Sequence, residues 1–167
     1  MEIIFYLTSA VALVASLLVI VGLNAIHALL YLVVSLLAVS LLFYLLGAPF
    51  AAGLQVIIYA GAIMVLFVFV IMMLNQGEAA TDRERHWLKS VAWWGPFVLG
   101  AVLLGELLYV LIAGAGLGGG GATVEAQQVG IALFGPYLLA VELASLLLLA
   151  ALVGAYRLGR ERADGKR

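Results

Sequence analysis

Two glutamates lie inside apolar stretches of this sequence and are its first candidates for chemistry: Glu106 within LLGELLYV and Glu142 within LLAVELASLL. A carboxylate is costly inside a lipid bilayer, so such residues usually carry protons or pair with a neighbouring group. We interpret Glu142 as a candidate proton-path residue or, alternatively, as a structural group supported by Ser145. Glu106 lies nearer the end of its stretch and close to Tyr109, which favours a structural role in reach of interfacial water.

The remaining side chains exclude several kinds of site. There is no cysteine, which removes disulfides, thiolate metal sites and iron–sulfur ligation. The only histidines, His27 and His86, are too far apart in sequence to suggest a metal or haem site. We expect His27 to lie at the surface near a helix start capped by Asn24, and His86 to anchor an interfacial segment with Trp87. We therefore expect no cofactor, no metal and no catalytic residue in this chain.

The composition indicates an integral membrane protein. Of the 167 residues, 66% are hydrophobic and 10% are charged, and the mean hydropathy is +1.24. Five apolar runs are long enough to cross the roughly 30 Å hydrocarbon layer as helices. Alternating barrel strands are absent, so we predict an all-α, polytopic membrane protein that forms a single transmembrane domain. The five predicted helices span residues 3–22, 28–46, 54–74, 96–113 and 136–156.

The connections support this division. GAPFAAG at 47–53 predicts a tight turn, and Pro96 and Pro136 suit the first turns of the fourth and fifth helices. Residues 114–135 form a glycine-rich linker, in which Thr123 could cap a short surface helix.

The basic residues predict an orientation. All eight Lys and Arg fall within 83–89 or 157–167, and basic loops are normally cytoplasmic. This places the N-terminus and the 114–135 linker in the periplasm, and makes 157–167 a basic cytoplasmic tail. The tail is most simply a topology determinant and secondarily a contact for anionic membrane lipid or for a soluble partner.

The third predicted helix carries no carboxylate, and its polar atoms belong to Gln55 and Tyr59. Gly61 lies near its middle between two alanines, although a helical glycine costs about 1 kcal/mol relative to alanine. One explanation is close packing against a neighbouring backbone. The other is a deformable hinge or π-bulge. The residues alone leave both open.

Three stretches resemble one family. They are NAIHALLYLVVSLLAVS at 24–40, LQVIIYAGAIMVLFVFVIMMLN at 54–75 and LFGPYLLAVELASLLLL at 133–149. Together they resemble the J subunit of bacterial respiratory complex I, the NADH:quinone oxidoreductase. The resemblance covers the chain apart from the glycine-rich linker and the tail, and YAGAIMVLF is its most specific portion.

This resemblance implies five transmembrane helices in the bacterial inner (plasma) membrane, and a subunit of a proton-translocating oxidoreductase with no catalytic centre of its own. The implied partners are the quinone-binding H subunit, the small A and K subunits and the antiporter-like N subunit. FMN, iron–sulfur clusters, NADH and a quinone such as ubiquinone would bind elsewhere in the complex. No nucleic acid is implied.

The resemblance also implies a π-bulge in the third helix, which maps onto Tyr59 to Val65 and favours the mechanical explanation of Gly61. Rotation of Val65, Phe67 and Met72 would then open or close a hydrated path. Many members of the family carry glutamate at the position of Gln55, so the resemblance gives no support to a proton relay there. Glu106 is not part of the family pattern, which again favours a structural role.

Two other functions compete with this one. A structural or assembly subunit of the same complex, or of a related antiporter or hydrogenase complex, would need Gly61 for packing alone. An autonomous transporter or channel would call for paired intramembrane charges or an inverted repeat. Neither feature is evident in the sequence.

Overall fold

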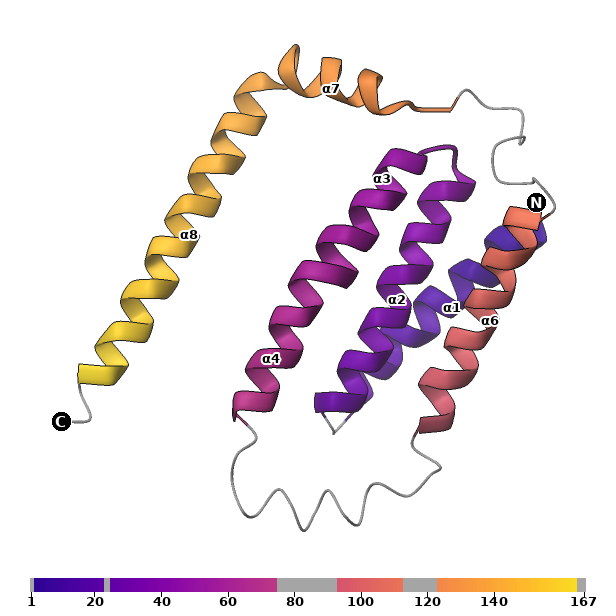
Figure 1. Ribbon diagram of the computed structural model, residues 1–167, viewed down its shortest axis with the longest axis horizontal. Coiled ribbons are helices and arrows are strands. Elements are labelled where there is room, and N and C mark those ends of the chain that lie inside the picture. Colours follow the sequence, from indigo (N-terminus) through magenta and orange to yellow (C-terminus); the bar gives the residue numbers. More distant parts are fainter. Residues whose placement is uncertain (1, 23–24, 75–92, 113–122, 165–167) are drawn as a thin grey trace, which may run out of the picture. The chain divides into compact units, whose positions relative to one another are not determined.

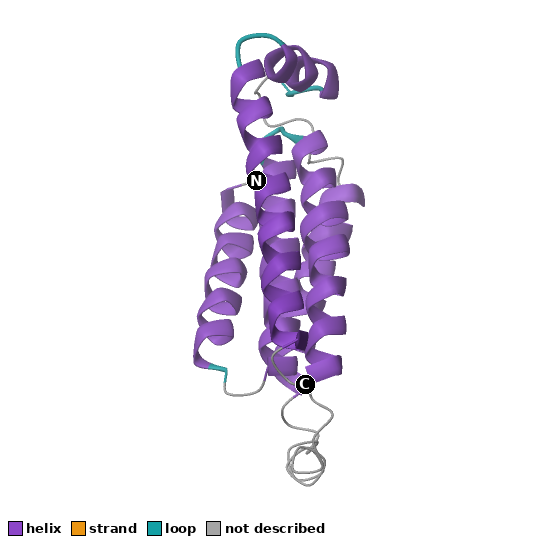
Figure 2. Ribbon diagram, turned by 90° about the vertical axis from the view of Figure 1, so that its left-hand side faces the viewer, coloured by secondary structure: helices purple, strands orange, loops and turns teal. Residues whose placement is uncertain are grey.

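The computed structural model describes residues 2–22, 25–74, 93–112 and 123–164, and within these ranges it contains helices and no strand (Figures 1 and 2). Five of the helical stretches are long and apolar enough to cross a membrane. The predicted all-helical, five-span architecture is therefore confirmed for the described residues. The chain divides into two compact units, Met1–Val124 and Glu125–Arg167, which are described separately.

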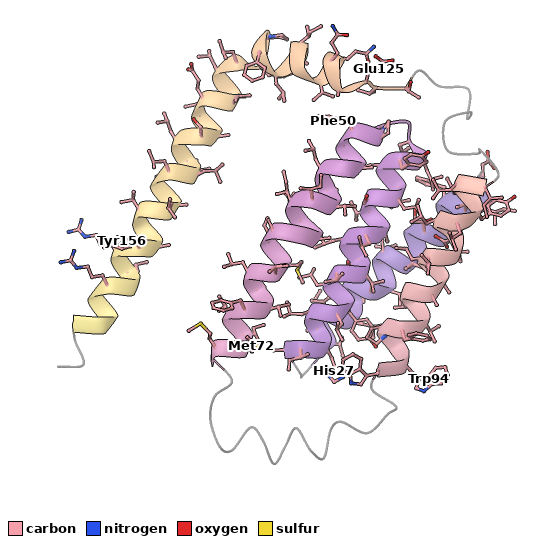
Figure 3. The ribbon with its side chains drawn as sticks, in the orientation of Figure 1. His27, Phe50, Met72, Trp94, Glu125 and Tyr156 are labelled. Carbon is pink, nitrogen blue, oxygen red and sulfur yellow. The ribbon has the colours of Figure 1, made fainter. Side chains whose placement is uncertain are left out.

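The first unit contains four of the five spans. They are α1 (Glu2–Val21), α2 (Ala25–Leu45), a composite third span, and α6 (Trp94–Ile112). The third span consists of α3 (Pro49–Leu54), the π-helix η1 (Gln55–Ile63) and α4 (Met64–Leu74). These spans run side by side (Figure 1). His27, Met72 and Trp94 lie at one end of this unit and Phe50 lies at the other (Figure 3).

Small side chains pack α1 against α2. Ala15 and Ala38 are completely buried, and Ala12 is almost so. Small residues let helix backbones approach closely, and the resulting van der Waals packing favours helix association in lipid. The Ser16 and Ser35 hydroxyls lie 2.8 Å apart across the same interface. With Leu103 of α6, these helices build the core of the unit, whose buried apolar residues are Val11, Ala12, Ala15, Val34, Ala38 and Leu103.

The third span begins earlier than the sequence predicts. Gly47 turns the chain with a φ of 81°, a left-handed conformation that favours glycine. Pro49 then occupies the first turn of α3, where its missing N–H costs nothing. The predicted start at residue 54 is therefore wrong, because most of GAPFAAG belongs to the helix. Gly53 lies within α3 rather than in a turn.

The second unit contains α7 (Ala126–Phe134) and α8 (Leu138–Asp164). The predicted linker therefore includes a short helix, and its N-cap is Glu125 with Gln128 in a capping box rather than Thr123. Pro136 lies in the turn just before α8, not in its first turn. The helix also continues into the predicted tail as far as Asp164.

Candidate functional site

The π-helix in the middle of the third span is the most unusual feature of the backbone. Runs of i→i+5 hydrogen bonds are rare and frequently mark functional positions. The Met64 N–H donates to the carbonyls of Tyr59 and Gly61 and so passes over Ala60, its α-helical partner. At the other boundary, the Gln55 N–H donates to the carbonyls of Ala51 and Ala52. Ala51 is the α-helical partner of Gln55, so the shift to i→i+5 bonding is seen at the Met64 boundary.

Gly61 lies inside the π-helix, where space for a side chain is small. A Cβ at position 61 would lie 3.3 Å from the backbone oxygen of Val56, five residues earlier. This distance is tighter than an ordinary van der Waals contact, so even alanine would press on that carbonyl. Glycine relieves the contact and also lowers the barrier to changes of backbone conformation.

A serine from α2 contacts α3 one turn before the π-helix. The Ser40 hydroxyl donates to the Ala52 carbonyl at 2.9 Å, and both residues are buried. Ala52 is also one of the two acceptors of the Gln55 N–H. This hydrogen bond ties α2 to the last turn of α3, directly before the π-helix begins.

The predicted gating residues occupy two parts of the span. Tyr59 and Gly61 lie in η1, whereas Val65, Phe67 and Met72 lie in α4. The π-helix runs from Gln55 to Ile63, so it begins before the predicted Tyr59 and ends before the predicted Val65. Tyr59 is 49% exposed and Val65 is 67% exposed in this chain. A gate formed by these side chains would therefore need surfaces beyond this unit.

The second candidate, Glu142, lies on α8 in the second unit and is exposed there. The Ser145 hydroxyl donates to the backbone carbonyl of Glu142 at 2.7 Å. The suggested support of the carboxylate by Ser145 is thus wrong, because a serine three residues on reaches the backbone of its own helix.

Glu106 is in a different position from the one predicted. It is only 7% exposed, and its Oε2 lies at a hydrogen-bond distance of 2.7 Å from the hydroxyl of Thr8, a completely buried residue of α1. The prediction that Glu106 reaches interfacial water is therefore wrong. The structure instead brings Glu106 and Thr8 together, a pair that sequence reasoning missed. The available signal was spacing, because Leu103, Glu106 and Val110 share one face of a helix and all three are buried.

The histidine near the start of α2 makes an aromatic contact. The rings of His27 and Trp93 lie 6.2 Å apart and meet edge to face at 73°. Asn24, His86 and Trp87 lie outside the described residues. Within the described part of the chain, no group of three or more His, Cys, Asp or Glu residues could hold a metal ion.

Known proteins resemble this chain over nearly all of its length. Residues 15–158 match a family described as NADH-ubiquinone/plastoquinone oxidoreductase chain 6. A Pseudomonas aeruginosa protein named NADH-quinone oxidoreductase subunit J is 60% identical over 98% of this chain and 99% of its own length. The protein of the same name from Escherichia coli K12 is 52% identical over 99% of this chain and 90% of its own. A Buchnera aphidicola protein of that name is 47% identical over 97% and 99%.

Proposed function

We propose a function on the premise that this chain belongs to the NADH-ubiquinone/plastoquinone oxidoreductase chain 6 family, as a subunit J of NADH-quinone oxidoreductase. The predicted resemblance to that family is thereby confirmed, and the chain is a multi-pass membrane subunit. Its proposed role is to couple quinone reduction elsewhere in the complex to proton translocation. The element that carries the coupling is the third span, acting as a two-state gate between π and α winding.

The observation that carries this proposal is the π-helix over Gln55–Ile63 with Gly61 inside it. Coupling between distant sites needs an element with two discrete arrangements, whose equilibrium both sites bias. A helix that can hold or release one extra residue has two such arrangements. Conversion to α winding would return the Met64 N–H to the Ala60 carbonyl.

The conversion would move the side chains that follow. One residue corresponds to a rotation of about 100° in a helix with 3.6 residues per turn. Val65, Phe67 and Met72 would then turn to a different side of the span. A cluster of apolar side chains that closes or opens in this way gates charge movement by excluding or admitting water.

The setting of this gate is proposed from the family and the charges. The protein would lie in the bacterial inner membrane, beside the quinone-binding H subunit, the small A and K subunits and the antiporter-like N subunit. The N-terminus would face the periplasm and the C-terminus the cytoplasm, as the basic clusters indicate. Glu142 is a proposed member of the proton path. FMN, iron–sulfur clusters, NADH and quinone would bind to other subunits.

The test is Gly61→Val in the assembled complex, with Gly100→Val as the matched control because a Cβ at position 100 meets nothing within 4 Å. Pressing on the Val56 carbonyl should cost about 1–3 kcal/mol in the π form, as overpacking does. We expect normal amounts of complex and at least a severalfold loss of NADH-driven proton uptake by membrane vesicles.

The alternative, an assembly subunit, makes the opposite prediction. If Gly61 serves packing alone, Gly61→Val should reduce the amount of complex on a native gel and leave the proton uptake of each assembled complex unchanged. Full assembly together with unchanged proton uptake would overturn the gate.

A further inference from the structure

Glu106 and Thr8 form a buried polar pair between α6 and α1 that the proposed gate does not use. Glu106 occupies the packing face of α6, between the buried residues Leu103 and Val110. The Ile112 end of α6 is six residues away, about 9 Å at 1.5 Å per residue. The pair therefore lies within both helices, near the Glu2 end of α1 and nearer to the Ile112 end of α6 than to its Trp94 end.

The helices α1, α2 and α6 carry no Lys or Arg that could compensate a negative charge at this position. All eight Lys and Arg belong to 83–89 or 157–167, which lie outside α1, α2 and α6. The tyrosines nearest to the pair in sequence, Tyr6 and Tyr109, are largely exposed. A carboxylate taken out of water without a partner charge is strongly disfavoured.

The hydrogen bonds around the pair lead to the same conclusion. Thr8 Oγ1 lies 2.7 Å from Glu106 Oε2 and 2.8 Å from the backbone oxygen of Ile4. A hydroxyl has one proton and can fully serve only one of these acceptors. A proton on Oε2 resolves the competition, because Thr8 then donates to Ile4 and accepts from the carboxylic acid.

The other carboxyl oxygen of Glu106, Oε1, indicates that a water molecule can reach the pair. Glu106 Oε1 is buried and has no hydrogen-bond partner among the residues that the structure describes. A buried polar atom without a partner needs an explanation, and an ordered water is a common one. A neutral carbonyl oxygen at this place demands far less solvation than one half of a carboxylate.

We propose that Glu106 and Thr8 form a buried proton-binding site between α1 and α6, in which Glu106 Oε2 holds one exchangeable proton against Thr8 Oγ1. The ligand is a proton that arrives through water, and Oε1 is the atom that meets this water. The site does not depend on the winding of the third span, so either proposal can fail without the other.

Infrared spectroscopy of the purified, intact complex tests this site. The wild-type minus Glu106→Gln difference should contain the C=O stretch of a neutral carboxylic acid, and this band should move to lower frequency in D2O. Thr8→Val should move the band to higher frequency, because the acid loses its hydrogen-bond acceptor. Thr8→Ser, which keeps the hydroxyl, should leave the band in place.

The control is Glu125→Gln at the N-cap of α7, since Glu125 is exposed and its loss should remove carboxylate stretches instead. The proposal is overturned if Glu106→Gln also removes only carboxylate stretches, or if the acid band does not respond to D2O. If Glu106→Gln prevents assembly, the infrared difference spectrum between Thr8→Val and the wild type tests the proposal by itself. A shifted acid band supports the site, and a change confined to carboxylate stretches, or none at all, refutes it.

Discussion

The helices α1, α2 and α6 differ from the third span in how much of their surface the chain itself covers. In the most apolar window of α2, 28% of the residues are buried, against 6% in the third span. The helices α1, α2 and α6 enclose completely buried alanines and a serine pair. In the third span, by contrast, only Ala52 and Met64 are buried among the described residues. Within the first unit, the regular helices are thus the packed ones, and the span with π winding is the least packed.

The difference shows where this sequence permits a change of backbone conformation. Close-packed interfaces resist small displacements, because every side chain already fills its space. A span held by few internal contacts leaves its winding to be decided by local hydrogen bonds and by whatever surrounds it. We therefore expect substitutions in the packed helices to change the amount of assembled complex, and substitutions at the π-helix to change turnover.

The largest effect is expected for Ala38→Leu. Ala38 is completely buried between α1 and α2, and overpacking such a site costs about 1–3 kcal/mol. The amount of complex on a native gel should fall severalfold, with normal turnover in what assembles. Ala10→Leu on the exposed side of α1 is the control and should assemble normally. If Ala38→Leu gave a normal amount of complex with reduced turnover, the assignment of assembly to the packed helices and of turnover to the π-helix would be contradicted.

A smaller loss is expected for Gly95→Ala. A Cβ at position 95 would lie only 1.9 Å from the Tyr31 hydroxyl oxygen, so the phenol of α2 must move. We expect about 1–2 kcal/mol of destabilisation, measured as a lower thermal inactivation midpoint of the complex. Tyr31→Phe should recover part of this loss, and additive effects of the two changes would argue against the contact. Gly100→Ala should be harmless.

Ser40→Ala tests the boundary of the π-helix. The change removes the hydrogen bond to the Ala52 carbonyl, which should cost about 1 kcal/mol. Assembly should persist, while turnover per complex changes by about fivefold. Ser9→Ala is the control, because Ser9 donates to Phe5 within its own helix. Unchanged turnover in Ser40→Ala would show that this serine does not influence the winding.

The smallest effect is expected for Ser16→Ala. The change removes the hydroxyl contact to Ser35, while Ser35 still has the Ala12 carbonyl at 3.3 Å as an acceptor. Interhelical hydrogen bonds in membranes average about 0.6 kcal/mol. The inactivation midpoint of the complex should fall slightly, and turnover should not change. A loss as large as that of Ala38→Leu would mean that the serine pair, and not the alanines, holds these helices together.

The sequence predicted the spans better than their ends. Apolar length fixes a membrane helix, so all five predicted spans are present. The end signals are weaker, because a proline or a glycine can belong to a turn or to a helix. Pro49 and Gly53 belong to α3, and the fifth span continues into the basic residues that were expected to form a tail.

The candidate sites show a similar limit. Gly61 was recognisable because glycine is costly in a helix and its flanking motif is specific. The π-helix boundaries were not, since they depend on which carbonyl each N–H selects. The partner of Glu106 is Thr8, 98 residues away, and no local pattern connects the two. Burial of that carboxyl became visible only when α1 and α6 were placed side by side.

Met64 adds a mechanical consequence. It follows the π-helix directly, it is only 2% exposed, and it is the one buried side chain among residues 64–73. A twist that starts in the π-helix reaches this thioether before it reaches Val65, Phe67 or Met72. Rotation of the rest of the span would require Met64 to move out of its buried position, so we expect this side chain to resist small changes of winding. The side-chain volume at position 64 would set that resistance.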